Sequence, residues 1–355
     1  MRRILGALLS LALLIFVTRL FSRSPDLVER VYSDWLYKVI LPPISRLTGI
    51  FPFSLAEVLI ILLLVWLGIG IVRRLSPKSL EKTEHSKHGW VSFIVLTALI
   101  YLGFQALWGL NYHRQTFADT GGLDVRVTTN EEVEKLADIL VYDANRLRVA
   151  VDEDDEGIMQ LGSNPRKILG QAAAGYAELT EDYPGLSGKY GSPKPLLLSR
   201  LISYSGIYGF YFPFTGEANI NVDIPQVMLP VSTCHEMAHQ RGVAREEEAN
   251  LVAYLSAINN PLPEFKYSAT IFALSYVLND VAARDEKKFE TLKDSLDPGV
   301  IRDFKEIRNF SERHKGPWSR AFSRINDAYL KANSQSKGVQ SYSGVVDLLV
   351  ALIVR

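Results

Sequence analysis

The chain has 355 residues, which is enough for a membrane anchor and one sizeable folded domain. Lysine and arginine together number 39, as do aspartate and glutamate, so the overall charge gives no indication of nucleic-acid binding. Cys234 is the single cysteine, which excludes an internal disulfide framework. These features are typical of a neutral enzyme or a membrane protein without a nucleic-acid partner.

Three apolar segments at the start of the chain predict membrane-spanning helices, at about residues 4–21, 51–72 and 90–112. Each is close to the ~20 residues that cross a bilayer. The first segment has the length of a signal peptide, but residues 19–24 lack the small side chains of a cleavage site, which favours a retained helix. Glu57, near the start of the second segment, is expected to reach water at the membrane surface.

Basic residues predict how the chain is oriented in the membrane. Arg2 and Arg3 precede the first segment, and the 73–89 loop carries five more lysines and arginines. The positive-inside rule assigns both stretches to the cytoplasm. We therefore expect a multi-pass protein of the cytoplasmic membrane with the lipid bilayer as a partner. Residues 1–112 form the anchor, and residues 113–355 form an extracytoplasmic domain.

The sequence after the anchor predicts a mostly helical domain with a small β-sheet, and thus a membrane-anchored α+β fold. A helix start at Thr128-Thr-Asn-Glu-Glu leads a helix to about Val149, and a second helix covers Pro165 to Leu179. The glycine- and aromatic-rich residues 206–223 have β character. Further helical patterns follow at 226–241, 265–283, 285–313 and 318–331, and the apolar run 345–354 is too short to cross a bilayer.

The segment from Thr233 to Asn250 contains the motif His235-Glu236-x-x-His239. Residues four apart share a helix face, so both imidazoles can bind one metal ion, and Glu236 lies beside the ion where a general base for water belongs. The alternative is an amphipathic helix in which these residues have this spacing by coincidence. Cys234 points about 100° away from His235 and is expected to be a small buried residue.

The residues after the motif favour a metal site over coincidence. Gly242 is placed to end the first helix in a left-handed conformation, and a second helix begins at about Arg245. Glu246 shares a face with small alanines that allow close approach to the first helix, so we expect it to be the third ligand. Asn250, one turn later, is expected to hydrogen-bond a ligand. Glu248 lies on a face with larger residues and stays the alternative third ligand.

His-Glu-x-x-His followed by Glu-x-x-Ala-Asn resembles the gluzincin metallopeptidases, in which two histidines and a glutamate hold zinc. Residues 234–250 are more closely similar to a family of uncharacterised bacterial membrane proteins, which carry a zincin-like domain after N-terminal transmembrane helices. Residues 212–221 and 341–349 are similar to that family as well, so the resemblance spans most of the chain.

The resemblance implies a Zn²⁺ cofactor bound by His235, His239 and Glu246. Only six residues separate His239 from Glu246, far fewer than in typical gluzincins, and this departure keeps Glu248 open as the third ligand. In zincins an edge strand lies along the cleft and pairs with the extended substrate backbone. Glu217, Ala218 and Asn219 are therefore expected to bind substrate; the alternative is an ordinary hairpin that packs on the motif helix.

These features predict a membrane-anchored zinc hydrolase, a metallopeptidase that cleaves peptide or protein substrates outside the cytoplasmic membrane. Glu236 would take a proton from water and pass it to the leaving amine. The candidates for stabilising the oxyanion are Tyr204, Tyr208, Tyr211 and His314. The alternative function is a non-enzymatic membrane scaffold or binding protein with a structural or vestigial metal site. Structural zinc sites are closed and usually cysteine-rich, whereas two histidines and one glutamate leave a position open for water, which favours the hydrolase.

Overall fold

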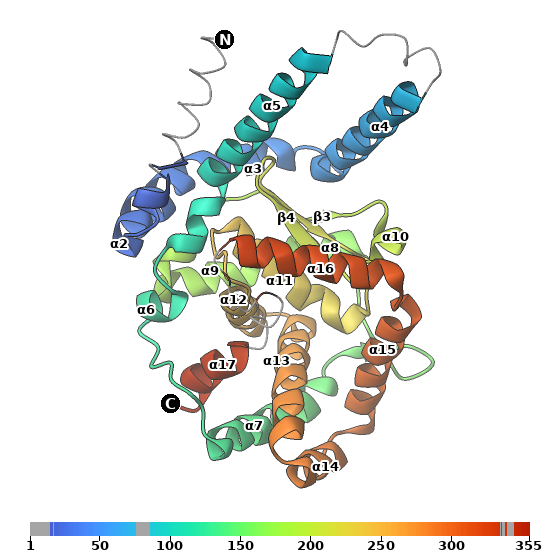
Figure 1. The fold of residues 1–355 in the computed structure, drawn as a ribbon. Helices are drawn as coiled ribbons and strands as arrows, with labels where there is room; N and C mark the ends of the chain where they lie inside the picture. Colours follow the sequence, from blue (N-terminus) through green and yellow to red (C-terminus); the bar gives the residue numbers. More distant parts are fainter. Residues whose placement is uncertain (1–14, 17, 76–85, 334, 336–337, 339–343) are drawn as a thin grey trace.

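The computed structural model describes the chain except residues 1–14, 17, 76–85, 334, 336–337 and 339–343 (Figure 1). The described residues form a mostly helical domain with a small sheet, from which two helices project. The predicted membrane span at 4–21 lies for the most part outside the described residues.

An arm of helices near the start of the chain packs on the domain. It comprises α2 (Pro25–Leu27), a π-helix (Val28–Leu36) and α3 (Tyr37–Gly49), which follow one another without a break. The Arg114 guanidinium donates hydrogen bonds to the carboxylate of Glu29, which lies in the π-helix. Contacts therefore cross the predicted boundary between residues 112 and 113.

The prediction of three N-terminal spans is wrong. In the part of the chain that the structure describes, one helix is long and apolar enough to cross a membrane. This helix is α4 (Leu55–Leu75), through its segment Leu55–Val72. In α5 (Ser86–Leu107), the apolar segment of the described residues is only Val95–Leu107.

The predicted third span is too long at its carboxyl end. Helix α5 stops at Leu107, and a 3₁₀ helix (Gly109–His113) follows. Trp108 and Tyr112 are buried against the arm of α2 and α3. In the sequence, the apolar end of the projecting helix α5 is followed directly by the buried residues Trp108 and Tyr112. The two segments therefore form one continuous apolar run, which the prediction took for a single span.

Helices build the rest of the domain. Those of its first half are α6 (Phe117–Gly121), α7 (Asn130–Arg148), α8 (Pro165–Gln171), α9 (Ala173–Asp182) and α10 (Ser199–Ser203). Those of its second half are α11 (Leu229–Gln240), α12 (Glu246–Ile258), α13 (Pro263–Arg284), α14 (Glu286–Asp294), α15 (Pro298–His314), α16 (Pro317–Ala332) and α17 (Val345–Ile353). Short 3₁₀ helices lie at Pro184–Leu186 and Gln226–Met228. Helices α11, α12 and α13 pack against one another at the centre, and α7 and α17 pack on α13.

The described part of the chain contains two small sheets. One is a hairpin of β1 (Asp152–Glu153) and β2 (Met159–Gln160). The other joins β3 (Lys194–Pro195), β4 (Gly209–Phe212) and β5 (Glu217–Ile220) in the order β3-β5-β4. β5 runs parallel to β3 and antiparallel to β4, so it has a partner on each side. The prediction that Glu217, Ala218 and Asn219 form an edge strand is therefore wrong, and the edge near the motif helix belongs to β4.

Side chains of β5 hold the start of α4. The Glu217 carboxylate accepts hydrogen bonds from the backbone N–H groups of Leu55 (3.2 Å) and Ala56 (2.9 Å). The Ser54 hydroxyl donates to the Asn219 side-chain oxygen at 2.6 Å. The first turn of a helix has N–H groups without intrahelical partners, and Glu217 satisfies two of them. Glu217 and Asn219 are buried and fasten α4 to the sheet instead of facing a substrate.

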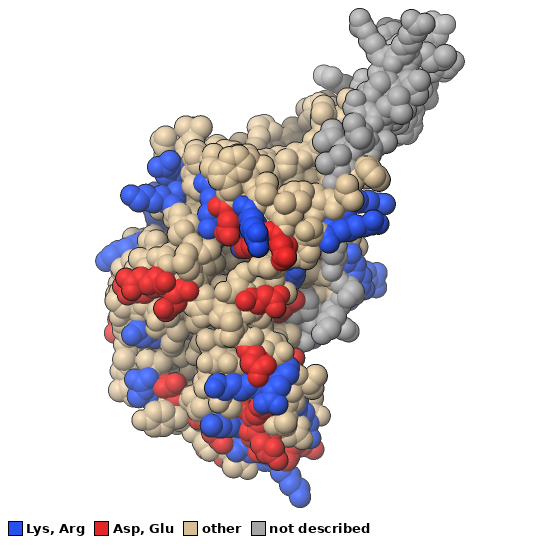
Figure 2. Space-filling view, turned by 90° about the vertical axis from the view of Figure 1, so that its left-hand side faces the viewer, with Lys and Arg blue, Asp and Glu red and all other residues tan. Residues whose placement is uncertain are grey.

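Charged side chains are unevenly distributed over the face of the molecule drawn in Figure 2. Figure 2 shows Lys, Arg, Asp and Glu side chains spread over the body of the domain, while the uppermost described surface is uncharged. Helix α4 projects from the domain, and only 11% of its apolar segment Leu55–Val72 is buried. A core helix of a soluble domain would be mostly buried, so α4 is not part of a core.

Candidate metal centre

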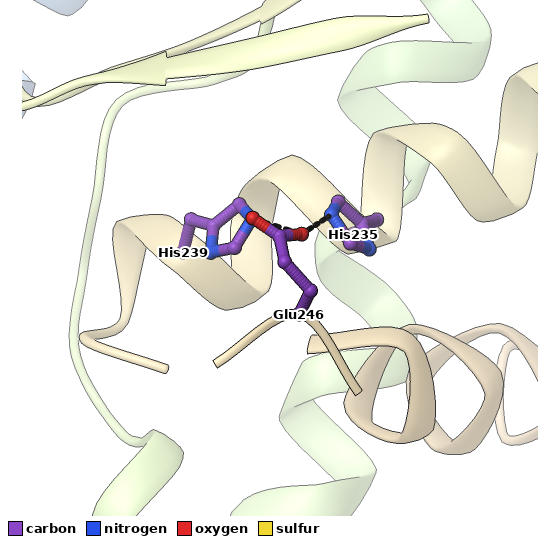
Figure 3. A group of neighbouring side chains, drawn as sticks. All are labelled: His235, His239 and Glu246. Carbon is purple, nitrogen blue, oxygen red and sulfur yellow. Dashed lines mark ion pairs between the residues drawn. The ribbon is translucent and has the colours of Figure 1, made fainter. Parts of the chain in front are cut away.

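Helix α11 presents the three residues of the motif from the centre of the domain. It begins at Leu229, with Pro230 in its first turn where a missing N–H costs nothing. The helix is buried along almost its whole length, and Cys234 is fully buried, as predicted. His235 and His239 lie one turn apart and point to the same side (Figure 3).

The chain reverses direction directly after the motif. Gly242 has φ +86°, which confirms the predicted left-handed residue. Its N–H donates to the carbonyl of His239 at 2.8 Å, and the Val243 N–H donates to the carbonyl of Ala238 at 3.1 Å. This pair of bonds is a Schellman motif, which ends α11 and sends the chain back along it.

The reversal brings α12 against α11 and Glu246 to the imidazoles. Glu246 is the first residue of α12, and Oε2 lies 3.3 Å from His235 Nε2 and 3.5 Å from His239 Nε2. One potential ligand atom from each of the three residues lies within 4.8 Å of the others (Figure 3). Ligand atoms at ~2.0–2.1 Å from a tetrahedral zinc ion are about 3.3–3.4 Å apart, and the two distances from Glu246 to the imidazoles are close to this value. Two imidazoles and one carboxylate also form a donor set that suits zinc.

Glu248, the alternative third ligand, is engaged elsewhere. Its Oε1 accepts hydrogen bonds from the Phe117 N–H at 3.0 Å and from Arg245 at 3.1 Å. Glu248 is buried and does not line the cleft that contains the two histidines. The structure thus brings Glu246 to the imidazoles and not Glu248. That Glu246 binds a metal remains a prediction.

The surroundings of His239 orient its imidazole toward Glu246. Nδ1 lies 2.7 Å from the carbonyl oxygen of Val243, the residue after the left-handed Gly242. A carbonyl can only accept, so Nδ1 carries the proton and donates it, which leaves Nε2 on the side of Glu246. The indole of Trp108 packs edge-on against the imidazole at 5.8 Å between ring centres.

The three candidate ligands are strongly coupled by charge. Burial alone would lower the pKa of His239, but the adjacent Glu246 raises it to about 9. Burial alone would raise the pKa of Glu246, but the charges and hydrogen bonds of His239 and His235 hold it far below its ordinary value. A buried carboxylate that stays ionised between two imidazoles is an environment that attracts a cation.

Glu236 lies beside this group with an unsatisfied oxygen. It is buried, and its Oε2 has no hydrogen-bond partner. Burial raises the pKa of Glu236, while the neighbouring His235 and His239 lower it. Its carboxylate lies against the backbone of β4 at Gly209, where a Cβ atom would come within 2.6 Å of Glu236 Cγ and 2.8 Å of Oε1. An orphaned buried oxygen points to a missing partner such as water or substrate.

The group opens into a cleft of about 1000 Å³ between α11, β4, α15 and α16. Of the residues predicted to serve the site, His235, Glu236, His239, Glu246 and Asn250 line this cleft, as do Tyr208, Tyr211 and His314. Tyr204, Glu217, Ala218 and Asn219 do not line it. The hydroxyl of Tyr276 is hydrogen-bonded to Asn250.

The sequence analysis missed several residues that line the cleft. Tyr112, Tyr276 and Tyr329 come from three separate segments, and the charge of Glu246 contributes to raising the pKa of each. Gly209 was also missed, although it packs against Glu236. The only local sequence feature that could have indicated Gly209 is the glycine- and aromatic-rich stretch in which it lies. No local sequence feature indicates that the three tyrosines line the cleft.

Gln240 and Arg241, which follow the motif, have structural roles. The Gln240 amide donates to the Ser45 hydroxyl and to the Gly216 carbonyl, both at 2.9 Å, and joins the motif helix to α3 and to the β4–β5 turn. The Arg241 guanidinium stacks on the ring of Tyr176 at 3.7 Å, which is a buried cation–π contact. These contacts hold the end of α11 in place from two sides.

Comparisons with known proteins place the chain in a family. No curated protein and no solved structure matches it. A family model matches residues 32–350, which include α3, the two projecting helices, the residues of the candidate metal centre and most of α17. The chain belongs to the family described as "Protein of unknown function (DUF3810)".

Proposed function

We propose that this protein is a zinc-dependent metallohydrolase that cleaves peptide bonds and is attached to the cytoplasmic membrane through α4. The observation that carries the proposal is the group of His235, His239 and Glu246, whose ligand atoms lie within 4.8 Å of one another beside the orphaned carboxylate of Glu236. Two histidines and one carboxylate are a ligand set of catalytic zinc sites, which keep an open position for water or substrate.

His235, His239 and Glu246 would hold the ion. Zinc supplies a Lewis acid that polarises a carbonyl group and makes water reactive at neutral pH. Glu236 takes a proton from the attacking water and passes it to the leaving amine. Burial raises the pKa of Glu236, which suits a group that must accept and then release a proton.

The edge strand β4 supports a polypeptide substrate. β4 pairs with β5 on one side only, and residues 208–211 line the cleft beside Glu236. An extended peptide can add to such an edge through backbone hydrogen bonds, which would place its carbonyl groups along the cleft. In this proposal, β4 binds the substrate backbone, which is the role predicted from the sequence for residues 217–219.

Tyr329 of α16 is our candidate for stabilising the oxyanion. Its hydroxyl accepts a hydrogen bond from the Tyr112 hydroxyl at 3.1 Å. Its own O–H group is therefore left to donate into the cleft. Burial raises the pKa of Tyr329, so the hydroxyl stays protonated at neutral pH.

The orientation of α4 supports an extracytoplasmic site. The start of α4 is bound to the sheet by Glu217, and the far end carries Arg73 and Arg74. Basic residues favour the cytoplasmic end of a span. Residues before α4 and after α5 pack in the same domain, so α5 would have to return the chain across the bilayer. The domain, at the opposite end of α4, would then face the outside.

The test is the Glu236→Gln variant of the full chain in lipid nanodiscs. Zinc is measured by mass spectrometry of the metal, and hydrolysis by mass spectrometry of a peptide library. We expect one bound zinc in both proteins and a loss of hydrolysis of ~10²–10⁴-fold in the variant. Glu178→Gln, on the exposed side of α9, is the matched control and should match the wild type. Wild-type protein that binds no zinc, or binds zinc and cleaves no peptide, would overturn the proposal.

A further inference from the structure

Large apolar side chains are exposed around the base of α4. On one side, Leu197 and Leu201 at α10 are 70% and 66% exposed. On another side, Leu47 in the last turn of α3 and Ile50 and Phe51 in the connection to α4 are exposed, with Ile50 at 74%. Soluble domains rarely expose several large apolar residues together, and such patches mark interaction surfaces.

Buried hydrogen bonds hold α10 against the first turn of α4. Both oxygens of the Glu57 carboxylate accept backbone N–H groups at 2.8 Å, from Leu197 and from Leu198. Glu57 is buried, so the prediction that it reaches water is wrong. It instead holds the exposed leucines of α10 beside the apolar helix.

The connection between α3 and α4 is fixed in the same way. The Lys194 ammonium donates to the carbonyls of Gly49 and Phe51, and Arg166 donates to the carbonyl of Pro52 at 2.7 Å. The apolar side chains of this connection are therefore held outward by a well-bonded backbone. Their exposure is a property of the fold and not of a loose segment.

We infer that Leu47, Ile50, Phe51, Leu197, Leu198 and Leu201 form a membrane-facing surface, which enters the lipid headgroup region around the base of α4. The inference rests on the proposed membrane attachment of α4, because this surface is continuous with that helix. Arg46 and Arg200 are exposed next to the apolar side chains, and Arg200 lies 3.9 Å from the carboxylate of Asp223 with its side chain 96% exposed. Such long, exposed cations can reach lipid phosphates. Apolar side chains flanked by exposed cations suit a lipid surface better than a protein partner.

This surface also fixes where the cleft lies. Ser203, the last residue of α10, and residues 205–209 after it line one wall of the cleft. Because α10 is bonded to α4, that wall is held close to the lipid headgroups. The substrates of the proposed hydrolase would then be polypeptide segments near the bilayer surface.

Depth-dependent fluorescence quenching tests the surface. Single cysteines replace Leu201 or Ile50 in the full chain, are labelled with an environment-sensitive dye, and are studied in nanodiscs that contain lipids with a nitroxide near the headgroup. Cys234 does not compete for the label, because it is fully buried and burial raises its pKa to about 12. Tyr142→Cys, at an exposed position of α7, is the matched control for a residue in water.

We expect the dye at positions 201 and 50 to be quenched several-fold more strongly than at position 142, with a shift of its emission to the blue. Equal quenching at positions 201, 50 and 142 would overturn the inference. Leu64→Cys, in the middle of α4, separates this failure from a failure of the anchor. If lipids with a deep nitroxide quench the dye at position 64 while the dye at positions 201 and 50 is not quenched, the proposed membrane-facing surface is refuted. The proposed attachment through α4 then still stands.

Discussion

Gly209→Ala tests whether β4 holds Glu236 in its working position. Gly209 packs directly against the Glu236 side chain, and its φ lies outside the left-handed region, so alanine is allowed by the backbone. The added Cβ would lie 2.6 Å from Glu236 Cγ and 2.8 Å from Oε1. The substitution therefore acts sterically, on the side chain of Glu236, the proposed general base.

The size of the effect follows from these distances. Ordinary contacts of a Cβ begin at 3.4 Å, so Glu236 must recede by about 0.8 Å. The backbone of β4 has little room to move instead, because the same Cβ meets the carbonyl oxygen of Asn219 at 2.9 Å. Misplacing a catalytic group by about 1 Å can cost ~10²-fold in rate, or ~2.7 kcal/mol in activation free energy.

The assay compares zinc content, thermal stability and peptide hydrolysis of Gly209→Ala with those of the wild type. We expect full zinc content and a loss of hydrolysis of ~10²-fold, because the candidate ligands lie on α11 and α12 and not on β4. Gly170→Ala, at an exposed glycine of α8 with open space around it, is the matched control. Unchanged hydrolysis by Gly209→Ala would refute the reasoning, since Glu236 would then be either mobile or not the base.

Three further predictions concern the metal, the oxyanion and the core. Glu246→Ala should abolish zinc binding. Glu248→Ala should keep zinc and lower the free energy of unfolding by ~1–3 kcal/mol, because it removes buried hydrogen bonds. Zinc content and thermal denaturation are measured for both variants, and the reverse pattern would make Glu248 the ligand. Tyr329→Phe should lower hydrolysis by ~10²–10³-fold with zinc retained, and wild-type activity would exclude this hydroxyl as the oxyanion donor. Asp303→Ala should cost ~3–5 kcal/mol of unfolding free energy in thermal denaturation, because it removes the buried partner of Arg148 at 2.9 Å and leaves this guanidinium with Glu153, whose side chain is 51% exposed. A small shift in the last case would mean that Glu153 alone balances the charge of Arg148.

The arrangement of the candidate site could be predicted because it is local. His235 and His239 share a face through the helix period alone. A glycine three residues after His239 can adopt the left-handed conformation that starts a reversal, and Gly242 does so. Once α12 folds back on α11, a residue in its first turn must lie beside the imidazoles, and Glu246 is that residue.

The number of candidate membrane spans was harder to predict, because hydropathy alone does not distinguish a helix that faces lipid from a segment buried in the protein interior. Trp108 and Tyr112 extend an apolar run, yet both pack against the arm of α2 and α3. Glu57 interrupts another apolar run, and its charge suggested contact with water. Its actual partners are backbone N–H groups of residues 197 and 198, which are 140 and 141 positions away. No pattern near residue 57 reports such a partner.

Strand order is a second property that the local sequence does not contain. Glu217-Ala-Asn-Ile is compatible with either an edge or a central strand, and the choice depends on β3, a two-residue strand more than twenty positions earlier. Because β3 occupies one side of β5, the free edge passes to β4, and Glu217 turns to the N–H groups of α4. The same sheet therefore bonds the proposed anchor through β5 and borders the cleft through β4. A shift of the sheet would therefore move the start of α4 and the wall of the cleft at β4 together.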